Sequence, residues 1–133
     1  MANAIYPLYK QSLIDGDSNI DLNDGTVKVA LVDTGTYTYS AAHQFLSSLT
    51  GVVGTAQTIN NTTVTNGVFD GDNVTFTAVS GNTVEALVFY IDTGAGGTSR
   101  LVAYIDTGVT GLPVTPNGGD IAITWSGSGI FSL

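Results

Sequence analysis

Three segments of the chain rise through apolar residues and end at the same tripeptide, Asp-Thr-Gly. The aspartates are Asp33, Asp92 and Asp106, and each follows a run such as Val-Phe-Tyr-Ile. Asp and Gly both end strands, Asp by accepting a hydrogen bond from its own backbone in an Asx-turn and Gly by adopting a positive φ. The repeated tripeptide therefore predicts three strands that stop at tight turns.

The same pattern, apolar-Asp-Thr-Gly, presents the catalytic carboxylate of aspartic proteases. Such an enzyme needs two carboxylates that face each other across a pseudo-two-fold axis and share one proton. In a short chain, Asp33 would supply one copy per subunit of a homodimer. Asp92 and Asp106 lie only fourteen residues apart, which predicts neighbouring strands of one sheet rather than opposite lobes. We therefore favour turns, with a dimeric protease as the alternative.

The composition is typical of a β-rich, turn-rich domain. The 133 residues include 17 glycines and no cysteine, 43% are hydrophobic and only 11% are charged. A chain of this length buries about two-thirds of its unfolded surface, so residues 1–133 are expected to form a single domain. The missing cysteines exclude zinc-thiolate sites and cysteine redox chemistry. We expect no cofactor.

The net charge is −8, because only Lys10, Lys28 and Arg100 are basic. A phosphate backbone would be repelled from nearly every face, so nucleic acid is a poor partner. No apolar run reaches the length of about 18 residues that a spanning helix needs, and the N-terminus lacks the pattern of a secretory signal. We expect a soluble, unprocessed protein that uses neither nucleic acid nor a membrane.

Apolar alternation and continuous apolar runs predict six strands, over residues 27–33, 73–79, 83–92, 99–107, 120–125 and 129–133. The strand over 83–92 is apolar on both faces apart from Glu85. It must be covered on both sides, by a second sheet and by either a helix or another subunit. The spacing from Asn73 onward suggests a meander of hairpins. The predicted fold is mainly β, an antiparallel β-sandwich or jelly-roll-like domain.

The N-terminal half is predicted to hold one or two short helices. Residues 7–14 have a proline in the first turn and Asp-Gly at the end. Residues 41–49 carry an apolar stripe, with Ser40 available as N-cap. Residues 57–65 are β-prone but polar on both faces, which suits an edge strand or an extended arm. Residues 1–26 form a possible N-terminal arm that contains the first helix.

Oxygen-bearing side chains occupy alternate positions of one acidic loop. The weak calcium candidates are Asp15, Asp17, Asn19 and Asp21. A calcium loop has glycine at its sixth position and a bidentate glutamate at its twelfth, where this chain has Ile20 and Thr26. A solvated acidic turn is therefore favoured, and no metal is expected.

His43 is the only histidine and so the only candidate base. No cysteine and no serine in a G-x-S-x-G context accompanies it, so the chain is expected not to be an enzyme. Four aromatic side chains in the first half have two open interpretations: Tyr6, Tyr9, Tyr37 and Tyr39. They could stack on sugars, as in a carbohydrate-binding module, or fill a seam between subunits, where tyrosine is enriched.

A series of short motifs runs along nearly the whole chain. It comprises Ala-Ile-Tyr before the first helix, Val-Lys-Val-Ala-Leu-Val, His-Gln-Phe-Leu, Val-Phe-Asp-Gly-Asp-Asn-Val-Thr-Phe-Thr, two Tyr-Ile-Asp-Thr-Gly segments and a closing Ile-Thr-Trp-Ser-Gly-Ser-Gly-Ile-Phe-Ser-Leu. In this order the motifs resemble a family of small structural proteins of tailed bacteriophages. The resemblance implies a virion component, made in the bacterial host cytoplasm. It implies a capsid decoration or cement protein, with a head-fibre or tail component as the alternative.

A cement protein bridges capsid subunits and needs a rigid body, an adhesive apolar segment and no chemistry. The hypothetical interface comprises Ile5, Tyr6, Leu8, Tyr9, Leu87 and Phe89. The first four would pack against the major capsid protein, another virion protein or a sister subunit, and the last two would lie near a symmetry axis. Local three-fold positions on a capsid favour a homotrimer. Deletion of residues 1–9 would then abolish particle binding and leave the β body folded.

Overall fold

The computed structural model describes residues 3–133 and shows a mainly β chain with antiparallel sheets. The largest sheet has five strands in the order β1-β8-β7-β2-β3. Their bounds are β1 Ala4–Ile5, β8 Arg100–Ile105, β7 Ala86–Asp92, β2 Thr26–Val32 and β3 Val52–Thr58. Within residues 3–133, no helix is long and apolar enough to cross a membrane.

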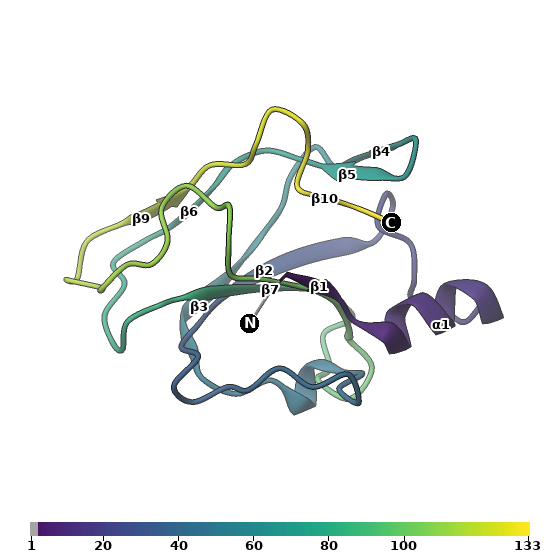
Figure 1. Cartoon of the computed structure of the whole chain (residues 1–133), viewed down its shortest axis with the longest axis horizontal. Helices are drawn as coiled ribbons and strands as arrows, with labels where there is room; N and C mark the ends of the chain where they lie inside the picture. Colours follow the sequence, from purple (N-terminus) through teal and green to yellow (C-terminus); the bar gives the residue numbers. More distant parts are fainter. Residues whose placement is uncertain (1–2) are drawn as a thin grey trace.

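Two smaller sheets form a second layer over one face of the large sheet, so the arrangement is sandwich-like (Figure 1). One has the order β10-β5-β4 and the other pairs β6 with β9. Their bounds are β10 Phe131–Ser132, β5 Val68–Asp70, β4 Thr63–Thr65, β6 Val74–Phe76 and β9 Ile121–Ile123. The opposite face is covered by the loop of residues 33–51, which contains the 3₁₀ turn η1, Leu46–Ser48.

The core is centred on β7, as its doubly apolar sequence predicts. β7 pairs with β2 on one edge and with β8 on the other. Leu87 and Phe89 are both 0% exposed, and the Phe89 ring lies 5.5 Å from that of Trp125 and 5.7 Å from that of Phe131. Leu87 and Phe89, predicted as interface residues near a symmetry axis, are therefore core residues of the single chain and not contacts to another subunit.

All six predicted strand segments contain a strand, but the predicted meander is wrong beyond the β7–β8 hairpin. β6 pairs with β9 and not with β7. Both edges of β7 are occupied by β2 and β8, so β6 has no free edge to join there. The predicted polar edge over 57–65 is confirmed in part. The segment is not one strand, because its two ends fall in β3 and β4, which are edge strands of two different sheets, and the buried Ile59 lies between them.

Of the two predicted helices, only the first forms. Helix α1 spans Pro7–Asp15 and is ended by Gly16, whose φ of 71° lies in the left-handed region. The helix predicted over 41–49 is wrong apart from η1. The backbone of Phe45 bridges that of Arg100 instead, so pairing with the sheet replaces the local helical hydrogen bonds there.

The N-terminal segment is part of the sheet rather than an arm. β1 extends the edge of β8, and the Tyr6 amide donates a hydrogen bond of 2.9 Å to the Val102 carbonyl. Tyr6 is 0% and Tyr9 2% exposed. Deletion of residues 1–9, of which 1 and 2 lie outside the described residues, would therefore open the core, so this deletion does not separate binding from folding.

Candidate functional site

Two of the Asp-Thr-Gly segments form the predicted Asx-turns. The Asp33 carboxylate accepts a hydrogen bond of 2.9 Å from the Gly35 amide, and the Asp92 carboxylate accepts one of 3.1 Å from the Gly94 amide. Asp33 also accepts a bond of 3.0 Å from the side chain of Asn82. These two carboxylates thus end strands, which confirms the turn interpretation.

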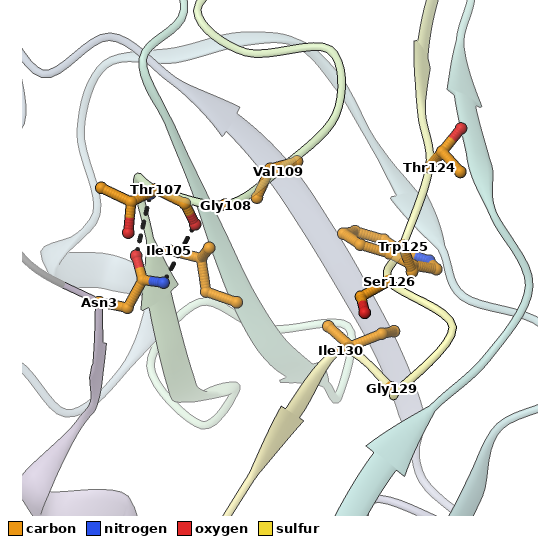
Figure 2. Close-up of a pocket in the computed structure, with 10 residues that line it drawn as sticks. All are labelled: Asn3, Ile105, Thr107, Gly108, Val109, Thr124, Trp125, Ser126, Gly129 and Ile130. Atoms are coloured by element: carbon orange, nitrogen blue, oxygen red, sulfur yellow. Dashed lines mark hydrogen bonds between the residues drawn. The ribbon is translucent and has the colours of Figure 1, made fainter.

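The third segment is held differently, by a side chain from the other end of the chain. The amides of Asp106 and Thr107 donate hydrogen bonds of 2.8 and 3.0 Å to the Asn3 side-chain oxygen. Figure 2 shows Asn3 beside Thr107. Both residues line a hollow of about 180 Å³, together with Trp125 and Ile130 among others. Among residues 3–133, no charged side chain lines this hollow. Sequence reasoning missed Asn3 because more than a hundred positions separate it from the turn it caps.

In the single chain, backbone amides favour the charged form of the first two turn aspartates. The Gly35 amide lowers the pKa of Asp33. The Gly94 amide, followed by the Lys28 ammonium 3.1 Å away, lowers the pKa of Asp92. A shared-proton pair requires one carboxyl whose pKa is raised. Both aspartates are instead stabilised as carboxylates.

These lowered pKa values predict a loss of stability in acid. A carboxylate whose folded pKa lies below its unfolded value of 3.8 stabilises the protein above that value and stops doing so as the pH falls through the folded pKa. We expect the melting temperature to fall steadily below about pH 4. Asp92→Asn should have a lower melting temperature than wild type at pH 7, and its melting temperature should fall less on acidification. Asp24→Asn changes an exposed turn and should keep the wild-type dependence of melting temperature on pH. Identical acid profiles for Asp92→Asn and wild type would contradict this role.

The acidic loop uses its side chains separately. The Asn19 amide group donates to the carbonyls of Ile91 and Thr98, and Asp21 accepts from the amides of Asn23 and Asp24. Asp17 lies 3.8 Å from the guanidinium of Arg100, and Asp15 ends α1. Among residues 3–133 no group of three or more acidic, histidine or cysteine side chains is arranged to hold a metal ion. The structure therefore does not bring the four calcium candidates Asp15, Asp17, Asn19 and Asp21 together.

Four tyrosines form a cluster to which the loop of residues 33–51 contributes two members: Tyr6, Tyr37, Tyr39 and Tyr104. The hydroxyls of Tyr6 and Tyr37 are 2.7 Å apart, and the Tyr37 hydroxyl lies 2.7 Å from Nδ1 of His43. His43 therefore fixes the position of the Tyr37 hydroxyl within the cluster. Tyr6, Tyr9 and Tyr37 are at most 2% exposed, so they provide neither a sugar-stacking platform nor a subunit seam.

An open cleft of about 390 Å³ adjoins the cluster, and we call it the tyrosine cleft. It is lined by Thr34, Tyr37, Thr38, Tyr39, Glu85, Tyr104 and Asp106. Burial and then the nearby Asp106 carboxylate raise the pKa of Tyr104 to about 12. The lining offers carboxylates, hydroxyls and rings, and none of the described residues adds a basic side chain to it. Its members come from three distant segments. The sequence drew attention to Tyr37 and Tyr39 as possible stacking side chains, to Asp106 as a turn residue and to Glu85 as the one charge of the doubly apolar segment, but no pattern connected them.

A second depression is apolar, and we call it the apolar groove. Two adjoining hollows of about 380 and 360 Å³ share Leu13 and Leu133. The apolar side chains that line them are Ile5, Tyr9, Leu13, Ile14, Ile20, Leu22, Val64 and Leu133. Ile14 is 86%, Leu133 57% and Val64 48% exposed. Of the predicted interface residues with partial exposure, Ile5 lines the groove and Leu8 lies outside its lining.

Comparisons with protein-family models and with curated proteins find no match to this chain. The fold and the sites define a mainly β, sandwich-like protein with one apolar groove and one acidic, tyrosine-lined cleft.

Proposed function

We propose that the chain is a non-enzymatic virion structural protein, a decoration or cement protein that binds the outer surface of the capsid. The observation that carries the proposal is the apolar groove, where Ile14 and Leu133 are more than half exposed. Contiguous apolar surface on a soluble domain marks a site of interaction. The series of motifs that resembles phage structural proteins supports the major capsid protein or another virion protein as the proposed partner.

The groove is built on a rigid support. The Tyr9 hydroxyl donates a hydrogen bond of 2.8 Å to the Ile20 carbonyl, which ties α1 to the following loop. The Ser12 hydroxyl donates to the Tyr9 carbonyl and is itself buried. A surface that is ordered before binding loses little conformational entropy on binding. In this proposal the protein binds as a homotrimer at local three-fold positions of the shell.

The groove predicts which substitutions weaken particle binding. Burial of one large apolar side chain contributes about 1.5–3 kcal/mol, so Ile14→Asp and Leu133→Asp are each expected to weaken binding at least tenfold. Both side chains are exposed, so the melting temperature should stay near that of wild type. Binding is measured by co-sedimentation with assembled shells of the same phage from which this protein has been removed.

Val52→Asp is the matched control, because Val52 is 44% exposed on β3 and lies outside the groove. It should bind shells as wild type does. Light scattering on the same samples gives the oligomeric mass. If Ile14→Asp remains a trimer but loses shell binding, the groove contacts the shell and not a sister subunit. Wild-type shell binding by both groove variants would overturn the proposal.

A receptor- or carbohydrate-binding module of a tail or head fibre is the second candidate function. Burial of Tyr6, Tyr9 and Tyr37 removes three of the four rings on which that prediction depended. Tyr39 remains partly exposed in the tyrosine cleft. Binding to a glycan array by a chain that ignores shells would favour this second function.

A further inference from the structure

We propose that Asn66 is a site of spontaneous covalent modification, at which the side-chain amide is lost and aspartate or isoaspartate replaces asparagine. The inference goes beyond the proposed function and does not depend on it. The reaction needs no partner protein, because its reactants are the Asn66 side chain, the backbone nitrogen of Gly67 and water.

The chemistry is an intramolecular acyl transfer. The backbone nitrogen of Gly67 loses its proton to solvent base and attacks Cγ of Asn66. A new N–Cγ bond forms, the Cγ–Nδ2 bond breaks and ammonia leaves, so that a cyclic imide remains. Water then opens the imide. Opening at Cγ gives aspartate, and opening at the main-chain carbonyl gives isoaspartate, in which the chain continues through Cγ. Nothing is oxidised or reduced.

The turn that joins β4 to β5 exposes the reacting groups. Thr65 pairs with Val68, so Asn66 and Gly67 form a two-residue loop between them. Their φ angles are 52° and 78°, the positive values of the type I′ turn that Asn-Gly favours. Both residues are exposed, and among residues 3–133 no backbone carbonyl accepts a hydrogen bond from the Gly67 amide. Solvent base therefore reaches the nucleophilic nitrogen.

The strand that precedes this turn is weakly held. β4 has three residues, all of them exposed, and it pairs on one edge only, with β5. Short segments with solvent-exposed hydrogen bonds open locally at a low free energy. Such openings let the backbone of the turn reach the geometry that ring closure needs, and Gly67 has no side chain to obstruct the approach to Cγ.

The chain contains a second Asn-Gly pair, Asn117-Gly118, which the structure protects. The Gly118 amide donates a hydrogen bond of 2.7 Å to the Val79 carbonyl, which shields its proton from solvent base. The Asn117 side-chain oxygen accepts a bond of 3.0 Å from the Gly119 amide, which ties the side chain to a different nitrogen. The local sequence makes both pairs reactive, and the fold selects Asn66.

Isoaspartate at position 66 changes the structure beside the turn. It adds a carbon to the backbone of a loop whose length sets the register of β4 against β5. The Leu133 amide donates a hydrogen bond of 3.0 Å to the Gly67 carbonyl, and this carbonyl moves when the loop lengthens. Formation of isoaspartate therefore displaces Leu133 from the turn.

Peptide mapping by mass spectrometry, on the full chain incubated at mildly alkaline pH, tests the proposal. Folded protein and protein unfolded in urea are sampled at the same times. In the folded chain we expect Asn66 to convert about tenfold faster than Asn117, a ratio that one protecting hydrogen bond can supply. In urea the two rates should be similar, because glycine follows both asparagines. Conversion of Asn117 as fast as Asn66 in the folded chain, or an Asn66 that reacts only in urea, would overturn the proposal.

Two variants separate the chemistry from its consequence. Asn66→Gly has no side-chain amide to lose and keeps a pair, Gly-Gly, that suits a type I′ turn, so no product should form at position 66. Asn66→Asp adds the charge of the modified residue without the extra backbone carbon. The NMR signal of the Leu133 amide should shift in aged protein that contains isoaspartate and should stay near its wild-type position in both variants. An unchanged Leu133 signal in isoaspartate-containing protein would contradict the displacement.

Discussion

Raising the pH from 10 to about 12 is expected to unfold this protein cooperatively, because burial raises the pKa of its core tyrosines. The pKa rises from 10.0 to about 12 for Tyr9 and Tyr104, and burial raises that of Tyr6 as well. The unfolded chain releases its phenolic protons near pH 10 while the folded chain retains them. Stability is therefore complete below pH 10 and declines as the pH rises toward the folded pKa, by about 1.4 kcal/mol per pH unit for each buried tyrosine.

Two signals followed together on the same sample test this expectation. Circular dichroism reports the fold, and ultraviolet absorbance reports phenolate formation. We expect the core tyrosines to ionise only as the sheet is lost. Tyr9→Phe keeps the ring and removes one titrating hydroxyl, so it should make the alkaline decline of the unfolding free energy shallower. Complete phenolate formation in a chain that keeps its native circular dichroism would contradict the burial of Tyr6, Tyr9 and Tyr104.

Truncating Phe89 to alanine is expected to destabilise the protein by about 3–5 kcal/mol. Phe89 is 0% exposed at the centre of β7, and its ring contacts those of Trp125 and Phe131 from the second layer. The substitution would leave a cavity between the layers, where neighbouring strands limit relaxation. A loss of this size is a large share of the roughly 5–15 kcal/mol that stabilises a typical domain.

Urea unfolding measured by circular dichroism gives the free energy for Phe89→Ala and for its control. Val52→Ala removes methyl groups from an exposed position of β3, so it should change the free energy by no more than about 0.5 kcal/mol. Phe89→Leu, which refills most of the cavity, should fall between the two. A loss below about 1 kcal/mol for Phe89→Ala would show that the layers do not depend on this contact.

Local patterns in the sequence predicted most of the elements. Apolar alternation and continuous apolar runs placed all six strand segments, since a strand alternates its side chains between two faces whatever it pairs with, and a strand covered on both faces is apolar throughout. Proline at the first turn and glycine after the last placed α1. Asp33 and Asp92 were predicted as turn residues because an Asx-turn depends only on neighbours two positions away.

Pairing between distant segments could not be predicted in this way. The apolar stripe over 41–49 has helical spacing, yet the edge of the sheet at Arg100 offers Phe45 a backbone partner and the helix does not form. β6 has a clear strand pattern, but its partner is fixed by which edges of the large sheet are already occupied. Asn3 caps the turn at Asp106 only because β1 joins the edge of β8.

The two candidate sites differ from the predicted interface because they, too, depend on how distant segments pack together. Sequence could identify Tyr6 and Phe89 as large apolar side chains, but not whether they would be covered by the same chain or by a partner. The sequence by itself determined a β-rich chain, the positions of its strands and two of its strand-ending turns. Only the tertiary structure decided that Tyr6 and Phe89 are core while Ile14 and Leu133 are surface, because burial depends on which distant segments pack together.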